Sequence, residues 1–137
     1  MVAPKLLEIG PELDDRIAGL RKSKGLIIDD CKEILSTHKF LMDTFYELTG
    51  LEKRSLASKY LHFHCPEKFF IYDSRARTGI GKLVKKSGKE LLKNVPDYDP
   101  EYGDFVCRMI ELQEYLDEQL GVYELPRKLD SFLLTAV

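Results

Sequence analysis

Apolar residues recur along the chain at intervals of three, four and seven, the spacing of one face of an α-helix. Leu13, Ile17 and Leu20 form the first such stripe. The most regular stripe comprises Phe105, Met109, Leu112 and Leu116. No two neighbouring segments show the alternation of apolar and polar residues that predicts a β-hairpin. The pattern therefore predicts an all-α protein.

Capping and turn residues set the limits of the predicted helices in the first half. Pro11 fits the first position of a helix that ends near Gly25. The apolar spacing predicts helix across residues 26–49, where Ser36 and Thr37, two good N-cap residues, divide it into two helices. The turn LTGLEKRS follows it.

The second half continues in the same way. A helix is expected from Ser55 to about residue 64, ending before Pro66. Asp73 suits the N-cap of the next helix, and two glycines at 79 and 81 either interrupt that helix or allow it a close contact. A capping box at residues 87–90 predicts a short helix ending near residue 94. Helices at 101–120 and from Pro126 complete a compact bundle of six to eight helices.

Length and composition favour one soluble domain spanning residues 1–137. Hydrophobic residues make up 44% of the chain and charged residues 32%, which are ordinary globular values. No apolar run is long enough for a membrane span, and the N-terminus lacks the pattern of a signal peptide. Three widely spaced cysteines indicate reduced thiols. We therefore expect a cytoplasmic protein that does not enter a membrane.

Charge is strongly polarised, although the net charge is only −2. Residues 75–93 contain seven basic residues and one acid, and residues 97–118 contain eight acids and one arginine. A basic face is typical of phosphate binding. The candidate nucleic-acid-binding residues are Arg75, Arg77, Lys82, Lys85, Lys86 and Lys89. The alternative is two solvated helix faces that attract each other, within one chain or between the subunits of a homo-oligomer.

Neither a metal nor a cofactor is predicted. His62 and Cys65 are three positions apart and share a helix face, but a zinc site needs three or four ligands. The segment GIGK at 79–82 lacks the full spacing of a phosphate-binding loop and the strand that precedes one. Close packing between helices explains its glycines equally well.

Asp73 is the strongest candidate for chemistry. It follows the apolar run FFIY and precedes a predicted helix rich in arginine. One interpretation is an ordinary N-cap. The other is a carboxylate at the mouth of a cleft, where it stabilises a developing cation or activates a water molecule. A helix N-terminus favours its ionised form, which suits either role.

The stretch around Asp73 resembles the helix-hairpin-helix DNA glycosylase superfamily, most closely its adenine glycosylase branch. The match comprises Ser55-Leu-Ala, Leu61 and the run Lys68-Phe-Phe-Ile-Tyr-Asp73, with 18 positions between Ser55 and Asp73. The resemblance covers about 30 residues. It implies an all-α glycosylase-like fold, DNA as partner, a catalytic role for Asp73, and Ser55 at the position where lyase members carry lysine.

The chain also departs from that family, and three functions stay open. LTGLEKRS replaces the family's LPGxG-type hairpin, and the iron–sulfur cysteine set is missing. The first function is DNA binding, with or without glycosylase activity. The second is a noncatalytic interaction or oligomerisation module of an accessory or phage-defence type. The third is another hydrolase using Asp73, Lys59 and either His62 or His64, since Lys59 lies four positions after Ser55 and three before His62 on one helix face.

Overall fold

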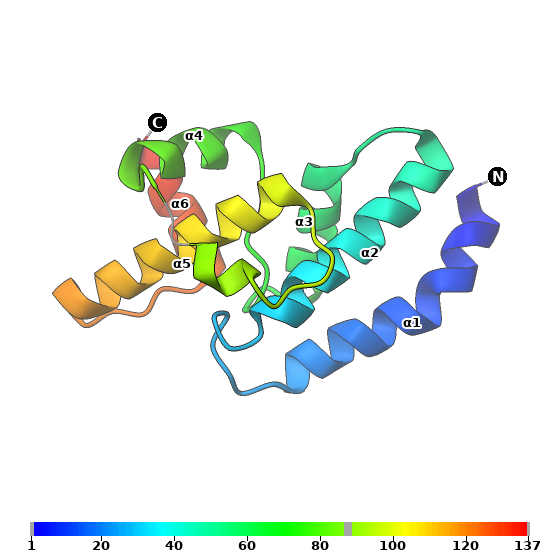
Figure 1. The fold of residues 1–137 in the computed structure, drawn as a ribbon, viewed down its shortest axis with the longest axis horizontal. Coiled ribbons are helices and arrows are strands. Elements are labelled where there is room, and N and C mark those ends of the chain that lie inside the picture. Colours follow the sequence, from blue (N-terminus) through cyan, green and yellow to red (C-terminus); the bar gives the residue numbers. More distant parts are fainter. Residues whose placement is uncertain (1, 87–88, 137) are drawn as a thin grey trace.

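The computed structural model describes residues 2–86 and 89–136, and within them all side chains except those at 2–9, 89, 132 and 134–136. These residues form six α-helices, one 3-10 helix and no strand (Figure 1). The helices are α1 (Val2–Lys22), α2 (Cys31–Thr49), α3 (Arg54–His64), α4 (Ser74–Leu83), η1 (Lys89–Leu92), α5 (Pro100–Leu120) and α6 (Pro126–Ala136). The predicted all-α bundle is confirmed.

The helices α1 and α2 lie side by side and are joined by a loop at residues 23–30 (Figure 1). The predicted stripe of Leu13, Ile17 and Leu20 is buried. Arg16 places its guanidinium 4.7 Å from the centroid of the Phe40 ring in α2, a cation–π contact at the edge of this pair. Burial of the stripe is the main force that holds α1 in place.

The helix α5 contributes a row of buried aromatic and aliphatic side chains to the core. Tyr102, Phe105 and Met109 are each at most 2% exposed. The Asp99 carboxylate caps the helix by accepting a hydrogen bond from the Tyr102 N–H at 2.9 Å. Gly121 ends it in the left-handed conformation, at φ 66°. The predicted limits of this helix are therefore confirmed, as is its apolar stripe.

Three predicted boundaries in the first half are wrong. The helix expected from residue 26 begins only at Cys31, after the loop at residues 23–30. The first helix begins at Val2, so that Pro11 lies inside it and not at its start. Pro11 is exposed, and the helix loses one internal hydrogen bond there without disturbing the core. The helix α2 runs unbroken through Ser36 and Thr37. Thr37 is itself buried, because the apolar period of the helix outweighs its capping preference.

In the second half, the structure decides between the two interpretations of the glycines against an interruption, and in favour of close contact at Gly79. The helix α4 continues through Gly79 and Gly81, and Gly79 lies on its buried face, where α4 packs against α5 and α6. The short helix predicted after the capping box is the 3-10 helix η1, while Ser87 of that box lies outside the described residues. In the described part of the chain, no helix is both long and apolar enough to cross a membrane.

Candidate functional site

The inner face of α3 holds the FFIY segment in place. The Ser58 hydroxyl accepts a hydrogen bond from the Tyr72 N–H at 2.9 Å, and the His62 Nδ1 lies 2.8 Å from the Phe69 carbonyl oxygen. Both α3 side chains are buried. The segment is thereby bound along α3 as irregular backbone, and it delivers Asp73 to the start of α4.

Asp73 is the N-cap of α4, as predicted. Its carboxylate accepts a hydrogen bond from the Ala76 N–H at 2.7 Å. Asp130 of α6 lies within electrostatic range: burial raises the pKa of Asp130, the negative charge of Asp73 raises it further, and His62 and Lys59 oppose the rise. The charges of Asp73, Lys59 and His62 therefore all act on Asp130, a carboxylate from a different helix. In the sequence, the only indication of a role for Asp130 is that it lies three positions after Arg127, a spacing that allows an ion pair on a helix.

Ser55, the residue suggested by the glycosylase resemblance, has a smaller role in the observed contacts. Its carbonyl accepts a hydrogen bond from the Ser58 hydroxyl at 2.8 Å, and it is Ser58 that reaches the Tyr72 backbone. Ser58 is fully buried, whereas Ser55 is half-buried. Sequence reasoning missed Ser58, although it lies four positions before His62 and thus on the same helix face.

The predicted basic residues do not converge on one surface. Arg77 lines a cavity of about 300 Å³ between α4 and α5 that also contains Tyr72, Glu101 and Arg108, and that Asp73 does not line. Arg75 and Lys82 are exposed and seven positions apart, which places them on the opposite flank of α4 from Arg77. Two more of the predicted residues, Lys85 and Lys86, line a separate groove beside α5, and the Lys89 side chain lies outside the described residues.

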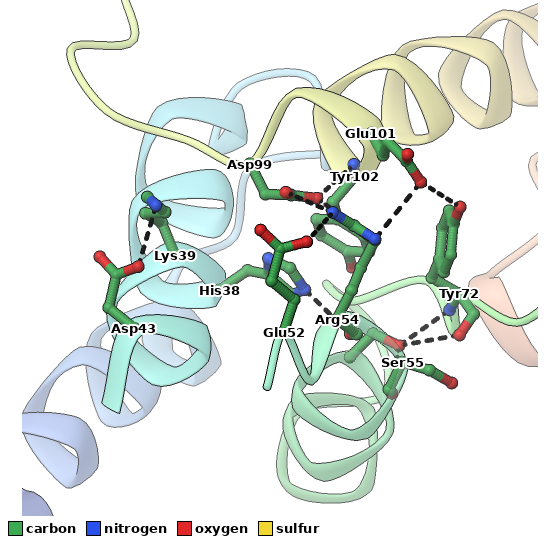
Figure 2. Close-up of polar contacts among 11 residues, drawn as sticks. His38, Lys39, Asp43, Glu52, Arg54, Ser55, Tyr72, Asp99, Glu101 and Tyr102 are labelled. Carbon is green, nitrogen blue, oxygen red and sulfur yellow. Dashed lines mark hydrogen bonds and ion pairs between the residues drawn. The ribbon is translucent and has the colours of Figure 1, made fainter. Parts of the chain in front are cut away.

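The strongest ion-pair network lies where α3 begins (Figure 2). Arg54 donates two hydrogen bonds to Asp99, at 2.5 and 2.9 Å, and lies 3.3 Å from Glu101 and 3.7 Å from Glu52. Tyr72 donates its hydroxyl hydrogen to Glu101 at 2.9 Å. We call these five residues the Arg54 network; it ties α3 to the start of α5.

The central pair of the Arg54 network is strongly coupled. Burial alone would raise the pKa of Asp99, but hydrogen bonds from Arg54 and from the Tyr102 N–H lower it below the ordinary value. The same hydrogen bond from Arg54 to Asp99 raises the arginine pKa. Asp99 therefore stays ionised and paired across the physiological range. A carboxylate committed in this way is suited to structural support and not to proton transfer.

His38 lies directly beneath the Arg54 network. Its ring stacks on Tyr102 with the centroids 3.8 Å apart, and Nε2 lies 3.2 Å from the Arg54 carbonyl oxygen. Burial lowers the pKa of His38 to about 4, and the nearby Arg54 and Lys39 charges contribute to the fall. Its Nδ1 is buried and has no hydrogen-bond partner among the described residues. His38 is therefore neutral at pH 7.

The far end of α3 presents aromatic rings to solvent. Phe63 is 81% exposed and Tyr60 is 38% exposed. The His64 ring contacts both, with centroids 4.5 Å from Tyr60 and 5.2 Å from Phe63. These three rings form one cluster, in which Phe63 is the most exposed and Tyr60 and His64 are partly covered.

Cations from the end of α1 adjoin this cluster. Arg21 donates a hydrogen bond from Nε to the His64 carbonyl oxygen at 2.6 Å. It also lines a cavity of about 420 Å³ together with Lys22, Lys24 and Lys68. Lys68 is neutralised by Asp30 at 2.6 Å, whereas Lys22 and Lys24 are exposed. We call Tyr60, Phe63, His64, Arg21, Lys22 and Lys24 the aromatic–cationic surface.

Neither region was foreseen as a unit from the sequence. Arg54 and Asp99 are 45 positions apart, and Arg21 and His64 are separated by 43. The one local signal was the Asp-Pro pair at 99–100, which is typical of a helix start. For the aromatic rings, the spacing of Tyr60 and His64 at i and i+4 indicated a shared face.

The described residues offer no set of side chains suited to hold a metal ion. Nowhere in these residues do three or more His, Cys, Asp or Glu side chains come together in a way that could hold one. Comparison of the chain with protein-family models, with curated proteins and with solved structures gave no match.

Proposed function

We propose that this chain is a nucleic-acid-binding domain that holds single-stranded or unpaired DNA on the aromatic–cationic surface. One observation carries the proposal. Arg21 belongs to the cationic cavity and is also hydrogen-bonded to the end of the helix that displays the three rings. Stacking groups and phosphate-binding groups thus adjoin each other, which is the combination that single-strand binding requires.

The exposed rings supply the stacking half of this combination. A single exposed phenylalanine is common in proteins and needs no explanation. Here three aromatic rings are in contact, and one of them is 81% exposed, so that the cluster adds little to the core. Base–aromatic stacking contributes roughly 1–3 kcal/mol per base and tolerates any base, because every base has a π face.

The cations supply the second half. Lys22 and Lys24 are exposed, and neither forms an ion pair with another described residue. Arg21 donates from Nε to a carbonyl oxygen and makes no ion pair with the carboxylates whose side chains the structure describes, although Glu67 lines the same cavity. The overall charge of −2 argues for a local electrostatic site and against coating by DNA.

A salt titration of DNA binding tests the proposal. Fluorescence anisotropy with a labelled oligothymidylate should show binding at about 50 mM salt, and the logarithm of the affinity should fall linearly with the logarithm of salt concentration. A duplex of the same length is the control and should bind more weakly, since its bases are not free to stack. Negligible binding to the single strand at low salt, or binding without a salt slope, would rule the proposal out.

A second candidate is hydrolysis of an N-glycosidic bond at Asp73. The observation that favours it is that Asp73 caps α4 while its charge, with those of Lys59 and His62, acts on a second carboxylate, Asp130. Two carboxylates in different environments can take different protonation states, and an ionised one can stabilise the cation left when a base departs. Release of adenine from DNA by the wild type, and its loss in Asp73→Asn, would support this candidate. Equal release by both proteins would exclude a role for the Asp73 charge.

A further inference from the structure

The cavity between α4 and α5 has no role in the proposed function. Its volume of about 300 Å³ lies at the lower end of the range for small-molecule sites. Its lining includes four charged side chains and two buried apolar ones: Arg77, Glu101, Asp104, Arg108, Ile80 and Phe105. Gly81 also lines it, and a β-carbon added there would have open space around it. We call this space the α4–α5 cavity; a small ligand in it would meet both charges and apolar contacts.

Two of the four charged side chains are engaged with each other. Arg108 donates a hydrogen bond from Nε to the Asp104 carboxylate at 2.8 Å, and another to the Val84 carbonyl oxygen at the end of α4. These contacts tie α5 to the end of α4 and neutralise one cation and one anion of the lining. The pair of Arg108 and Asp104 therefore supports the wall of the cavity.

The other two charged side chains, Arg77 and Glu101, keep capacity for a ligand. The Arg77 guanidinium forms no ion pair with another described residue, and it does not pair with Glu101 although both line the cavity. Both contacts of Glu101, with the Tyr72 hydroxyl at 2.9 Å and with Arg54 at 3.3 Å, use Oε2 (Figure 2). Among the described residues, Oε1 has no partner. A cation of α4 and a carboxylate oxygen of α5 thus line the same space without meeting.

Tyr72 shows that the charge of Arg77 acts close to Glu101. Burial raises the pKa of Tyr72, the hydrogen bond to Glu101 raises it further, and the charges of Arg77 and Arg54 oppose the rise. Arg77 is therefore within electrostatic range of the hydroxyl group that binds Glu101. Opposite charges that share a cavity without contact attract a molecule that carries the counterpart of each.

We propose that the α4–α5 cavity binds a small zwitterion, namely an amino acid with an apolar side chain. Its carboxylate is held by Arg77, whose planar guanidinium matches the geometry of a carboxylate. Its ammonium group donates to Oε1 of Glu101, and its side chain lies against Ile80 and Phe105. A purely anionic ligand such as phosphate is disfavoured, because Glu101 and Asp104 line the same cavity and would repel it.

Isothermal titration calorimetry of the full chain with L-phenylalanine tests the proposal. Two comparison ligands each lack one charged group and add no bulk: hydrocinnamate has no ammonium group, and phenethylamine has no carboxylate. The wild type should bind phenylalanine roughly tenfold more tightly than either, since each loses one charge-assisted hydrogen bond. No binding of phenylalanine at millimolar concentration, or equal affinity for the three ligands, would overturn the proposal.

Variants of the two side chains supply the decisive arm. In Arg77→Gln, the affinity for phenylalanine should fall to that for phenethylamine, which should itself be unchanged because phenethylamine has no carboxylate. In Glu101→Gln, the affinity for phenylalanine should likewise fall to that for hydrocinnamate. The side chain of Glu101 is 55% exposed, and glutamine keeps an acceptor for the Tyr72 hydroxyl, so the fold should persist.

Arg75→Gln is the matched control. Arg75 is also an exposed arginine of α4 but does not line the cavity, so all three affinities should stay unchanged. Equal loss of phenylalanine binding in Arg75→Gln and Arg77→Gln, or a parallel loss of phenethylamine and phenylalanine in Arg77→Gln, would contradict the assignment. None of the substituted residues belongs to the aromatic–cationic surface, so the outcome is independent of DNA binding.

Discussion

The two ends of α3 differ in how completely their polar and aromatic groups are used. At its start, the Arg54 network buries an arginine and a carboxylate and supplies each with several partners. At its end, the His64 ring contacts Tyr60 and Phe63, and Phe63 is almost fully exposed to solvent. Charged groups that are buried together must neutralise each other, and the role of such a pair is to hold the fold together. Exposed rings beside exposed cations do not stabilise the fold, and for that reason they point to binding.

Removal of the arginine should give the largest effect on stability. We expect Arg54→Met to lower the free energy of unfolding by about 3–5 kcal/mol, since it leaves Asp99 buried without its partner. Asp99 has a side chain only 5% exposed, so water cannot replace the arginine. Urea denaturation followed by circular dichroism measures the change.

The matched control for this variant is Glu52→Gln. Glu52 also pairs with Arg54, but its side chain is 66% exposed, and the change should cost less than about 0.5 kcal/mol. Equal destabilisation by the two variants would show that burial of the pair is not what gives the Arg54 network its strength.

Acid should act through the same region. Because burial lowers the pKa of His38 to about 4, while an unfolded histidine titrates near 6.5, the unfolded chain binds the proton more readily. The free energy of unfolding should therefore fall by about 3 kcal/mol as the pH drops from 6.5 to 4. Asp99, whose pKa is also lowered in the folded state, adds to the loss at the acid end.

The variant His38→Phe isolates the contribution of the histidine. Phenylalanine keeps the stacking on Tyr102 and cannot take up a proton. Unfolding measured between pH 7 and pH 4 should show a shallower dependence on pH in this variant than in the wild type. An unchanged dependence would assign the acid sensitivity to the carboxylates alone.

The other end of α3 should behave in the opposite way. We expect Phe63→Ala and Tyr60→Ala each to weaken binding of single-stranded DNA roughly tenfold, from the energy of one stacked base. The free energy of unfolding should change by no more than about 0.5 kcal/mol for Phe63→Ala, because that ring is almost fully exposed. Anisotropy titrations and urea denaturation on the same samples separate the two effects.

Tyr46→Ala is the control for this prediction. Tyr46 is 54% exposed on α2 and lies outside the cluster of rings. Its removal should leave DNA affinity unchanged. Equal loss in the control would indicate a nonspecific dependence on surface aromatic residues, and the contrast between the two ends of α3 would no longer hold.

How far the sequence predicts this molecule depends on the range of each interaction. The stripe of Leu13, Ile17 and Leu20 and the cap at Asp73 depend on residues a few positions apart, and both were correctly predicted. Pro11 was misjudged because its local preference for a helix start is outweighed by burial of the stripe beside it. The pairing of Arg54 with Asp99 depends on the tertiary fold and leaves no periodic signal.

The smallest expected effect concerns Asp73, whose variants separate a structural role from a catalytic one. Asp73→Ala should cost about 1 kcal/mol of stability, because the Ala76 N–H loses its acceptor. Asp73→Asn keeps an oxygen at that position and should cost clearly less. If Asp73 also carries out hydrolysis, Asp73→Asn will lose base release while it keeps its stability, since only the charge has gone. Urea denaturation and the base-release assay on the three proteins therefore separate the cap from the catalyst. Destabilisation of Asp73→Asn as large as that of Asp73→Ala would mean that the charge at the helix start, and not the accepted hydrogen bond, holds α4 in place.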